Sequence, residues 1–228
     1  MARTYNMPLR ILIYVAGVCL LAFGVVVNTR SDMGASTVNA IAFVFSENSF
    51  LTLGQATMCI YVADLLIQII VFKGISLRIA LQIPFSFAFG YLVDFFDGAV
   101  AGGFLSFFQY PDLGMGIFML MLGIVCTGVG VSMVMNMNFV PNPPDGCTQA
   151  VSKLSGLPFG RAKWLNDAGR LVIAALAGIA MAGHIMGIGI GTVLCMFTIG
   201  NTCQFVDDHL AEQYQRVYNP HANDVCIA

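Results

Sequence analysis

Three ionisable side chains lie within long apolar runs of this sequence, where an isolated charge is costly. Asp64 falls near the middle of the run 54–72, and Asp167 and Arg170 fall early in the run 161–182. An ionisable group inside a membrane-spanning helix is by default a candidate functional residue. We therefore assign Asp64, Asp167 and Arg170 as candidates for gating or for coupling to protons.

A structural role for the same three residues stays equally open. Asp64 and Arg170 could form a salt bridge that holds a helical bundle together. Asp167 and Arg170 could also pair within one helix, because they are three residues apart. Asp167 lies close to the start of its run, so an interfacial position is a further alternative.

A second chemical signal is the broken stretch at residues 141–160, which separates two apolar runs. Its prolines and an Asp-Gly pair stop the preceding helix, and residues 145–153 can restart as a short helix with Asp145 as N-cap. A broken helix is tolerated in a membrane only where it is buried in protein or lines a wet cavity. In transporters such segments typically mark the substrate site.

The first half of the chain contains a weaker counterpart at residues 34–46, which is too short to span a membrane as a helix. We predict that 34–46 and 141–156 are re-entrant half-helices, the first capped by Ser36 or Thr37. Helix N-termini aimed at one cavity favour an anion or a carboxylate group. Asp145 complicates this prediction, because it places a negative charge where an anion would bind. Its role is either that of a plain N-cap or that of a ligand for a cation or for the amino group of a zwitterion. The predicted substrate-binding residues are Ser36, Thr37, Asn39, Asn138, Asp145, Thr148 and Gln149.

Composition sets the class of protein. Hydrophobic residues make up 58% and charged residues 10%, against about 25% charged in a soluble domain. These values predict a polytopic membrane protein, and the net charge of −2 argues against a nucleic-acid partner. The seven cysteines show no metal or redox spacing, so we interpret them as packing residues and expect no metal or cofactor. No nucleophile set is present, and we expect no enzyme activity.

The apolar runs predict an all-α membrane protein with six transmembrane helices in two three-helix repeats. The first repeat covers residues 1–97 and the second 113–208, joined by a connecting loop at 98–112 and followed by a polar tail at 209–228. The tail is expected to be partly disordered or to lie at the surface. The predicted spans are residues 9–28, 54–72, 79–96, 113–135, 161–182 and 187–205.

An internal alignment supports the duplication. With an offset of 106 residues, the segment 53–56 falls on 159–162 and Asp64 falls on Arg170. With an offset of 110, Asn28 falls on Asn138, Gly90 on Gly200 and Asp97 on Asp207. Asp64 and Arg170 would then lie at matching depths and could pair across the axis that relates the repeats.

The placement of basic residues predicts the orientation. With a cytoplasmic N-terminus, six spans place nearly all of them on the cytoplasmic side, as membrane proteins prefer, together with the C-terminus. An odd number of spans in each repeat makes the two repeats inverted, so the broken segments enter from opposite faces and meet near the midplane. The basic residues on that side are Arg3, Arg10, Lys73, Arg78, Lys153, Arg161, Lys163 and Arg216.

Several short motifs resemble the YitT/YczE-like group of bacterial multipass membrane proteins. They are Pro-Asp-Gly at 144–146, Ser-Lys-Leu-Ser-Gly-Leu-Pro-Phe-Gly-Arg-Ala at 152–162, Gly-Ile-Gly-Thr at 189–192, Leu-Arg-Ile-Ala-Leu-Gln-Ile-Pro at 77–84 and Phe-Gly-Tyr-Leu-Val-Asp at 89–94. The resemblance covers most of residues 10–208 and implies a protein of the bacterial cytoplasmic (inner) membrane. It says little about the substrate, and the Asn-Pro-Pro run is richer in proline than the group leads us to expect.

Together these features favour a secondary carrier of a small polar solute, with anionic and zwitterionic solutes both compatible. The solute would bind between the two re-entrant helices, near the midplane. The expected partners are the lipid bilayer and the solute, and a homo-oligomer or a partner subunit stays open. The alternatives are a substrate-capturing or channel-like subunit that works with a partner, and a non-transporting scaffold or sensor.

Overall fold

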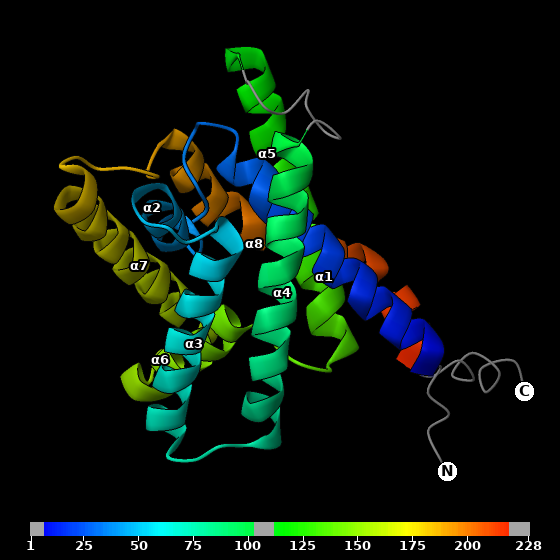
Figure 1. Cartoon of the computed structure of the whole chain (residues 1–228). Helices are drawn as coiled ribbons and strands as arrows, with labels where there is room; N and C mark the ends of the chain where they lie inside the picture. Colours follow the sequence, from blue (N-terminus) through cyan, green and yellow to red (C-terminus); the bar gives the residue numbers. More distant parts are fainter. Residues whose placement is uncertain (1–6, 103–111, 219–228) are drawn as a thin grey trace, which may run out of the picture.

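The computed structural model describes residues 7–102 and 112–218, and in this part of the chain it contains eight helices and no strand. Each half runs in the order long, short, long, long (Figure 1). Five of the six predicted spans fall wholly within long helices, and the sixth, predicted from residue 187, becomes helical only at Ile190. The helices are α1 (Met7–Thr29), α2 (Ala40–Asn48), α3 (Leu53–Phe72), α4 (Leu77–Ala101), α5 (Leu113–Met137), α6 (Pro143–Ser155), α7 (Phe159–Ala182) and α8 (Ile190–Tyr218).

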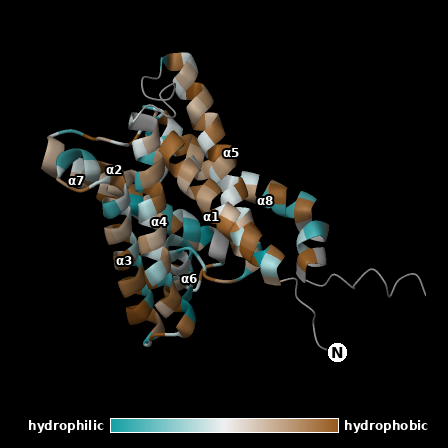
Figure 2. Ribbon diagram, turned by 45° about the vertical axis from the view of Figure 1, so that its right-hand side comes forward, coloured by the Kyte–Doolittle hydropathy of each residue, from teal (hydrophilic) through white to brown (hydrophobic). Residues whose placement is uncertain are grey.

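Five of the described helices, α1, α3, α4, α5 and α7, are long and apolar enough to cross a membrane. Hydrophobic residues run along much of α3 and α5 (Figure 2), and α7 leaves Val172 and Leu176 exposed. The fold is therefore that of a helical membrane protein. The predicted sixth span lies in α8, which is not among the five.

Two helices extend beyond the predicted boundaries. Helix α4 continues to Ala101, so the first residues of the predicted connecting loop are helical. Helix α8 continues to Tyr218, so the tail predicted from residue 209 begins as a helix. The rest of the predicted loop and tail, residues 103–111 and 219–228, lies outside the described residues.

Helices α1 and α5 cross in close contact over much of their length. Glycines make this approach possible, since a Cβ atom on Gly130 would lie 2.7 Å from the backbone nitrogen of Leu21 and 2.9 Å from the carbonyl oxygen of Gly17. A Cβ on Gly24 would lie 2.7 Å from the backbone nitrogen of Thr127. Small residues that let two backbones meet are typical of packing between membrane helices.

The short helices α2 and α6 both pack against the same two long helices, α3 and α7. Figure 1 shows α2 and α6 near opposite ends of α3. Helix α3 also packs along α4, where Gly54 and Gly90 bring the two backbones together. The four helices α2, α3, α6 and α7 thus enclose a separate region beside the α1–α5 crossing.

The close approach of α1 and α5 at Gly130 predicts that two glycine-to-alanine variants differ in stability. Gly130→Ala should lower the free energy of unfolding by about 1–3 kcal/mol, because its new methyl group meets backbone atoms that cannot move aside. Gly169→Ala is the matched control in α7, with nothing within 4 Å of its Cβ position, and should be neutral or stabilising by up to about 1 kcal/mol. Thermal unfolding in detergent measures both, and equal melting temperatures for the two variants would contradict the packing argument.

Candidate functional site

A buried ion pair joins the two long helices between which α2 and α6 lie. Nη2 of Arg170 on α7 donates to Oδ1 of Asp64 on α3 at 2.5 Å. The two residues are 5% and 3% exposed, respectively. Asp64 lies eleven residues after the first residue of α3, and Arg170 lies eleven residues after the first residue of α7. The pair anticipated from the internal alignment is therefore present.

Lys163 bridges two further carboxylates. Its Nζ lies 4.0 Å from Oδ1 of Asp145 on α6 and 3.9 Å from Oδ2 of Asp167, four residues further along α7. Asp167 is 4% exposed, so it is a buried residue rather than an interfacial one. Lys163, Asp167 and Arg170 share one face of α7, because spacings of three and four residues recur on one side of a helix.

We call Asp64, Asp145, Lys163, Asp167 and Arg170 the charged cluster. Asp145 interacts electrostatically with both Asp64 and Asp167, so the five side chains form one group across α3, α6 and α7. With every member ionised, three carboxylates face two cationic side chains, which leaves one net negative charge. Burying such a group costs free energy, and its net charge influences which ions or molecules can bind beside it.

Several buried polar atoms of this cluster and of the residues just before α2 and α6 have no hydrogen-bond partner among the described residues. Each costs about 1–3 kcal/mol when left unmatched, so these atoms require bound water or another molecule as a partner. Asn142 lies beside Tyr61, which itself interacts electrostatically with Asp64 and Asp145. The atoms are Oδ2 of Asp64, Oδ1 of Asp167, Nε of Arg170, Oδ1 of Asn39 and Oδ1 of Asn142.

The polar residues predicted at the start of the first short helix are all buried. Thr37 lies beside Asp167, which brings it to the charged cluster. Nδ2 of Asn39 donates to Oγ of Ser36 at 3.0 Å. The predicted caps are wrong, however, because α2 begins only after Asn39 and has no side-chain cap.

The second short helix also starts differently from the prediction. Its N-cap is Asn142, without a side-chain hydrogen bond, and Pro143 and Pro144 fill the first turn. Proline fits there because the missing N–H groups would have no partner inside the helix. Asp145 is therefore a first-turn residue and not the N-cap. Its carboxylate lies near the positive end of the helix dipole, which offsets part of the cost of burying it.

The other predicted binding residues fall in two places. Thr148 is buried, donates to the carbonyl oxygen of Pro144 at 3.0 Å and accepts from Nδ2 of Asn166 at 3.1 Å. Gln149 and Asn138 are exposed and face a cavity at the α6 end of the molecule. Of the predicted substrate-binding residues, some therefore lie buried near the charged cluster and the others line the cavity that leads to it.

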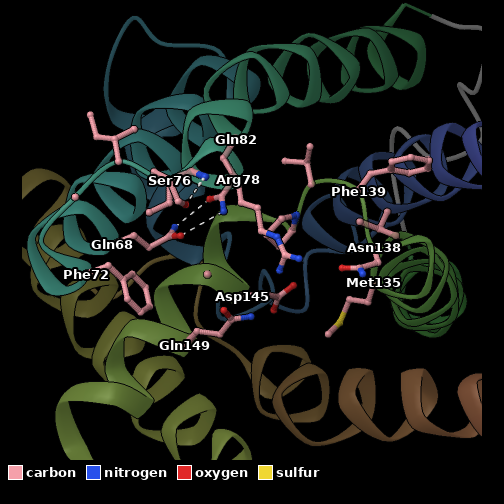
Figure 3. A pocket seen from close by; sticks show the side chains of 17 residues that line it. Gln68, Phe72, Ser76, Arg78, Gln82, Met135, Asn138, Phe139, Asp145 and Gln149 are labelled. Atoms are coloured by element: carbon pink, nitrogen blue, oxygen red, sulfur yellow. Dashed lines mark hydrogen bonds between the residues drawn. The ribbon is translucent and has the colours of Figure 1, made fainter.

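This first cavity has a volume of about 550 Å³ and lies between the α3–α4 turn, the end of α5 and helix α6 (Figure 3). Figure 3 shows Arg78 projecting into it in the direction of Asp145. Gln68 and Gln82 form part of its wall and hydrogen-bond each other at 3.0 Å and 3.3 Å. Because Asp145 lines the cavity and contacts Lys163, the cavity reaches the edge of the charged cluster.

A second cavity of about 540 Å³ lies at the α2 end and, like the first, is lined by segments from both halves of the chain. It is lined by the loop after α1, by α2 and by the α7–α8 loop, with Asp32 and Glu47 as its charged side chains. The described residues that line it include no member of the charged cluster. One end of the molecule therefore has access to the cluster, and the other has a separate acidic cavity.

Sequence reasoning missed two residues of this site. Lys163 was considered only as a charge that reports orientation, although its spacing of four from Asp167 was a usable signal. Asn142 was considered only as part of a proline-rich turn. Its burial depends on contacts with distant parts of the chain, and no local pattern marks it.

These features define a helical membrane protein with a buried charged cluster between two short helices. Residues 8–208 match a family model described as a family of unknown function, DUF6198, and the chain belongs to that family. The match does not extend to the YitT/YczE-like group by name, so that resemblance stays a prediction. Comparison with curated proteins and with solved structures found no match.

The buried pair predicts that a double variant is more stable than a single one. Asp64→Leu leaves the buried guanidinium charge of Arg170 without its hydrogen-bonded carboxylate and should cost about 3–5 kcal/mol in unfolding free energy. Adding Arg170→Met removes that charge and should recover most of the loss. Thermal unfolding tests both, and a double variant as unstable as Asp64→Leu would contradict the pairing.

The exposed pair between Arg30 and Asp97 supplies the control. Their two hydrogen bonds are 2.8 Å long, but the Arg30 side chain is 40% exposed. Arg30→Gln should therefore cost no more than about 1 kcal/mol.

Proposed function

We propose that this protein is a secondary carrier that binds a small polar solute at the charged cluster, near the middle of the membrane. The observation that carries this proposal is the set of unmatched buried polar atoms around a charged cluster, at the junction of two short helices from opposite ends. Short or broken helices that enclose polar groups at membrane depth are typical of transporter sites.

Paired contacts support an inverted repeat within this proposal. Helix α2 packs on α3 and α7, and α6 packs on α7 and α3. In the same way α4 packs on α1, and α8 packs on α5. Asp97 on α4 accepts from Arg30, which follows α1, and its counterpart Asp207 on α8 accepts from Asn136 on α5 at 2.7 Å. Two copies of one three-span unit in opposite orientations would produce these matching contacts.

The same pattern has one exception. Helix α3 packs extensively on α4, whereas α7 and α8 have no comparable contact in the described part of the chain. A carrier that alternates between two states needs its halves to differ in this way at any moment. The cavity that reaches Asp145 fits a state open at the α6 end and closed at the α2 end.

The distribution of charge supports an orientation for the proposed carrier. Lys73 and Arg78 follow α3 at the α6 end, whereas Asp32 and Glu47 lie at the α2 end. By the preference for basic residues inside, the α6 end would face the cytoplasm. The first residues of α1 and the last described residues of α8 lie on one side (Figure 1), as an even number of spans requires.

Transport by the purified protein in liposomes is the direct test. We expect uptake of at least one solute from a panel of amines, amino acids, carboxylates and sulfonates, measured with a pH-sensitive dye inside the liposomes. Asp167→Asn should reduce the initial rate at least about tenfold, because it alters the charge of the cluster. Asp97→Asn changes a carboxylate outside the cluster and should retain most of the activity.

Two other outcomes would favour different functions. Binding without uptake would support a capture subunit that needs a partner. Stable, correctly folded protein with neither binding nor uptake across the whole panel would support a scaffold and refute the carrier proposal.

The orientation makes a separate prediction about labelling. Lys73→Cys should react with a membrane-impermeant maleimide only from the cytoplasmic side, and Glu47→Cys only from the opposite side. The unsubstituted protein gives the background from its own cysteines. Reaction of both variants from one side would eliminate the two-ended arrangement of cavities.

A further inference from the structure

We infer that the solute is a small organic cation with a primary ammonium group, bound between the carboxylates of the charged cluster. This inference rests on the proposed carrier function and names its substrate class. It is carried by two independent features of the site, its net charge and the kind of hydrogen-bonding atoms that are left unmatched.

The net charge favours a cation. Lys163 and Arg170 are already engaged by Asp145, Asp167 and Asp64, and with every member ionised the cluster as a whole keeps one negative charge. An anion would raise that to two negative charges in a region of low dielectric constant. A monovalent cation would bring the cluster to neutrality, which reduces the cost of burial.

The unmatched atoms favour a molecule with more donors than acceptors. Four of the five are oxygen acceptors, and one, Nε of Arg170, is a donor. Ionised carboxylates accept hydrogen bonds only, and a primary ammonium group offers three donors. The residues that carry the four acceptors are almost completely buried, with exposures of 3% for Asp64, 4% for Asp167, 4% for Asn39 and 8% for Asn142. Such atoms cannot be satisfied from bulk water.

The arrangement suits an organic cation better than a metal ion. No group of three or more His, Cys, Asp or Glu side chains in the described part of the chain is placed to hold a metal. A hard metal ion needs several oxygens that converge on one point. An ammonium group with a short polar chain can instead reach acceptors that belong to α3, to α7 and to the loops before α2 and α6.

The cavity at the α2 end fits the same class of solute. Its charged side chains, Asp32 and Glu47, are both acidic, and a cleft lined by one sign of charge concentrates ions of the other sign. The cavity at the α6 end is more balanced, since Arg78 faces Asp145 across it. Attraction of cations should therefore be stronger at the α2 end.

Thermal stability with four defined probes tests this inference. Ethanolamine and propylamine carry a primary ammonium group, choline carries a quaternary one without N–H donors, and acetate is an anion. At about ten times its dissociation constant, a bound amine should raise Tm by about 3 °C or more. Choline at the same concentration should give a clearly smaller shift, and acetate none.

Variants assign the effect to the cluster. Asp167→Asn should abolish the amine shift, and Asp167→Glu should retain part of it because the charge is kept. Asn39→Ala changes no charge and should reduce the shift by removing one acceptor, which keeps the test informative if Asp167→Asn does not fold. Asp97→Asn is the matched control and should leave the shift unchanged.

The inference and the carrier proposal fail in different ways. Stabilisation by acetate with no effect of either amine would overturn the ammonium assignment and leave the carrier proposal intact. An amine shift that persists in both Asp167→Asn and Asn39→Ala would also overturn it, since the amine would then bind elsewhere. Failure of the carrier proposal would appear separately, as binding without uptake in liposomes.

Discussion

The need to compensate buried charge is the constraint on which the rest of this structure depends. Asp64 and Arg170 lie on helices that are otherwise apolar, and neither could remain ionised there without the other. Their contact fixes the distance between α3 and α7 and sets the depth at which the two helices face each other. Helices α2 and α6 then fill the space at either end of this contact. Their non-helical starts are acceptable because protein surrounds them.

Two kinds of packing serve different purposes in the molecule. Helices α1 and α5 meet through glycines, backbone against backbone, and the contact leaves no space to fill. The region around α3 and α7 is held instead by charges and hydrogen bonds, several of which lack partners. A tightly packed helix pair would keep the proposed carrier in shape. The polar region beside it, with its unmatched hydrogen-bonding atoms, would admit the solute.

The sequence predicted the helices well because long apolar runs leave few alternatives. Of the six predicted spans, only the last begins too early, at residue 187 instead of Ile190. The pairing of Asp64 with Arg170 was also accessible, since it followed from aligning the two halves. The helix caps were not predicted correctly. Pro143 and Pro144 fit the first turn of a helix, so α6 begins before Asp145 and not at it. The role of Lys163 and the cavities depends on side chains brought together from distant segments, which no local pattern encodes.

The difference between the α3–α4 contact and the α7–α8 region suggests a role for Gly200. Gly54 and Gly90 bring α3 and α4 into contact, but Gly200, the counterpart of Gly90, has nothing within 4 Å of its Cβ position. Under the proposed inverted repeat, the second half can adopt the geometry that the first now has. In the proposed carrier, the space beside Gly200 would then receive α7 when α3 separates from α4 and the charged cluster opens toward the opposite face of the membrane.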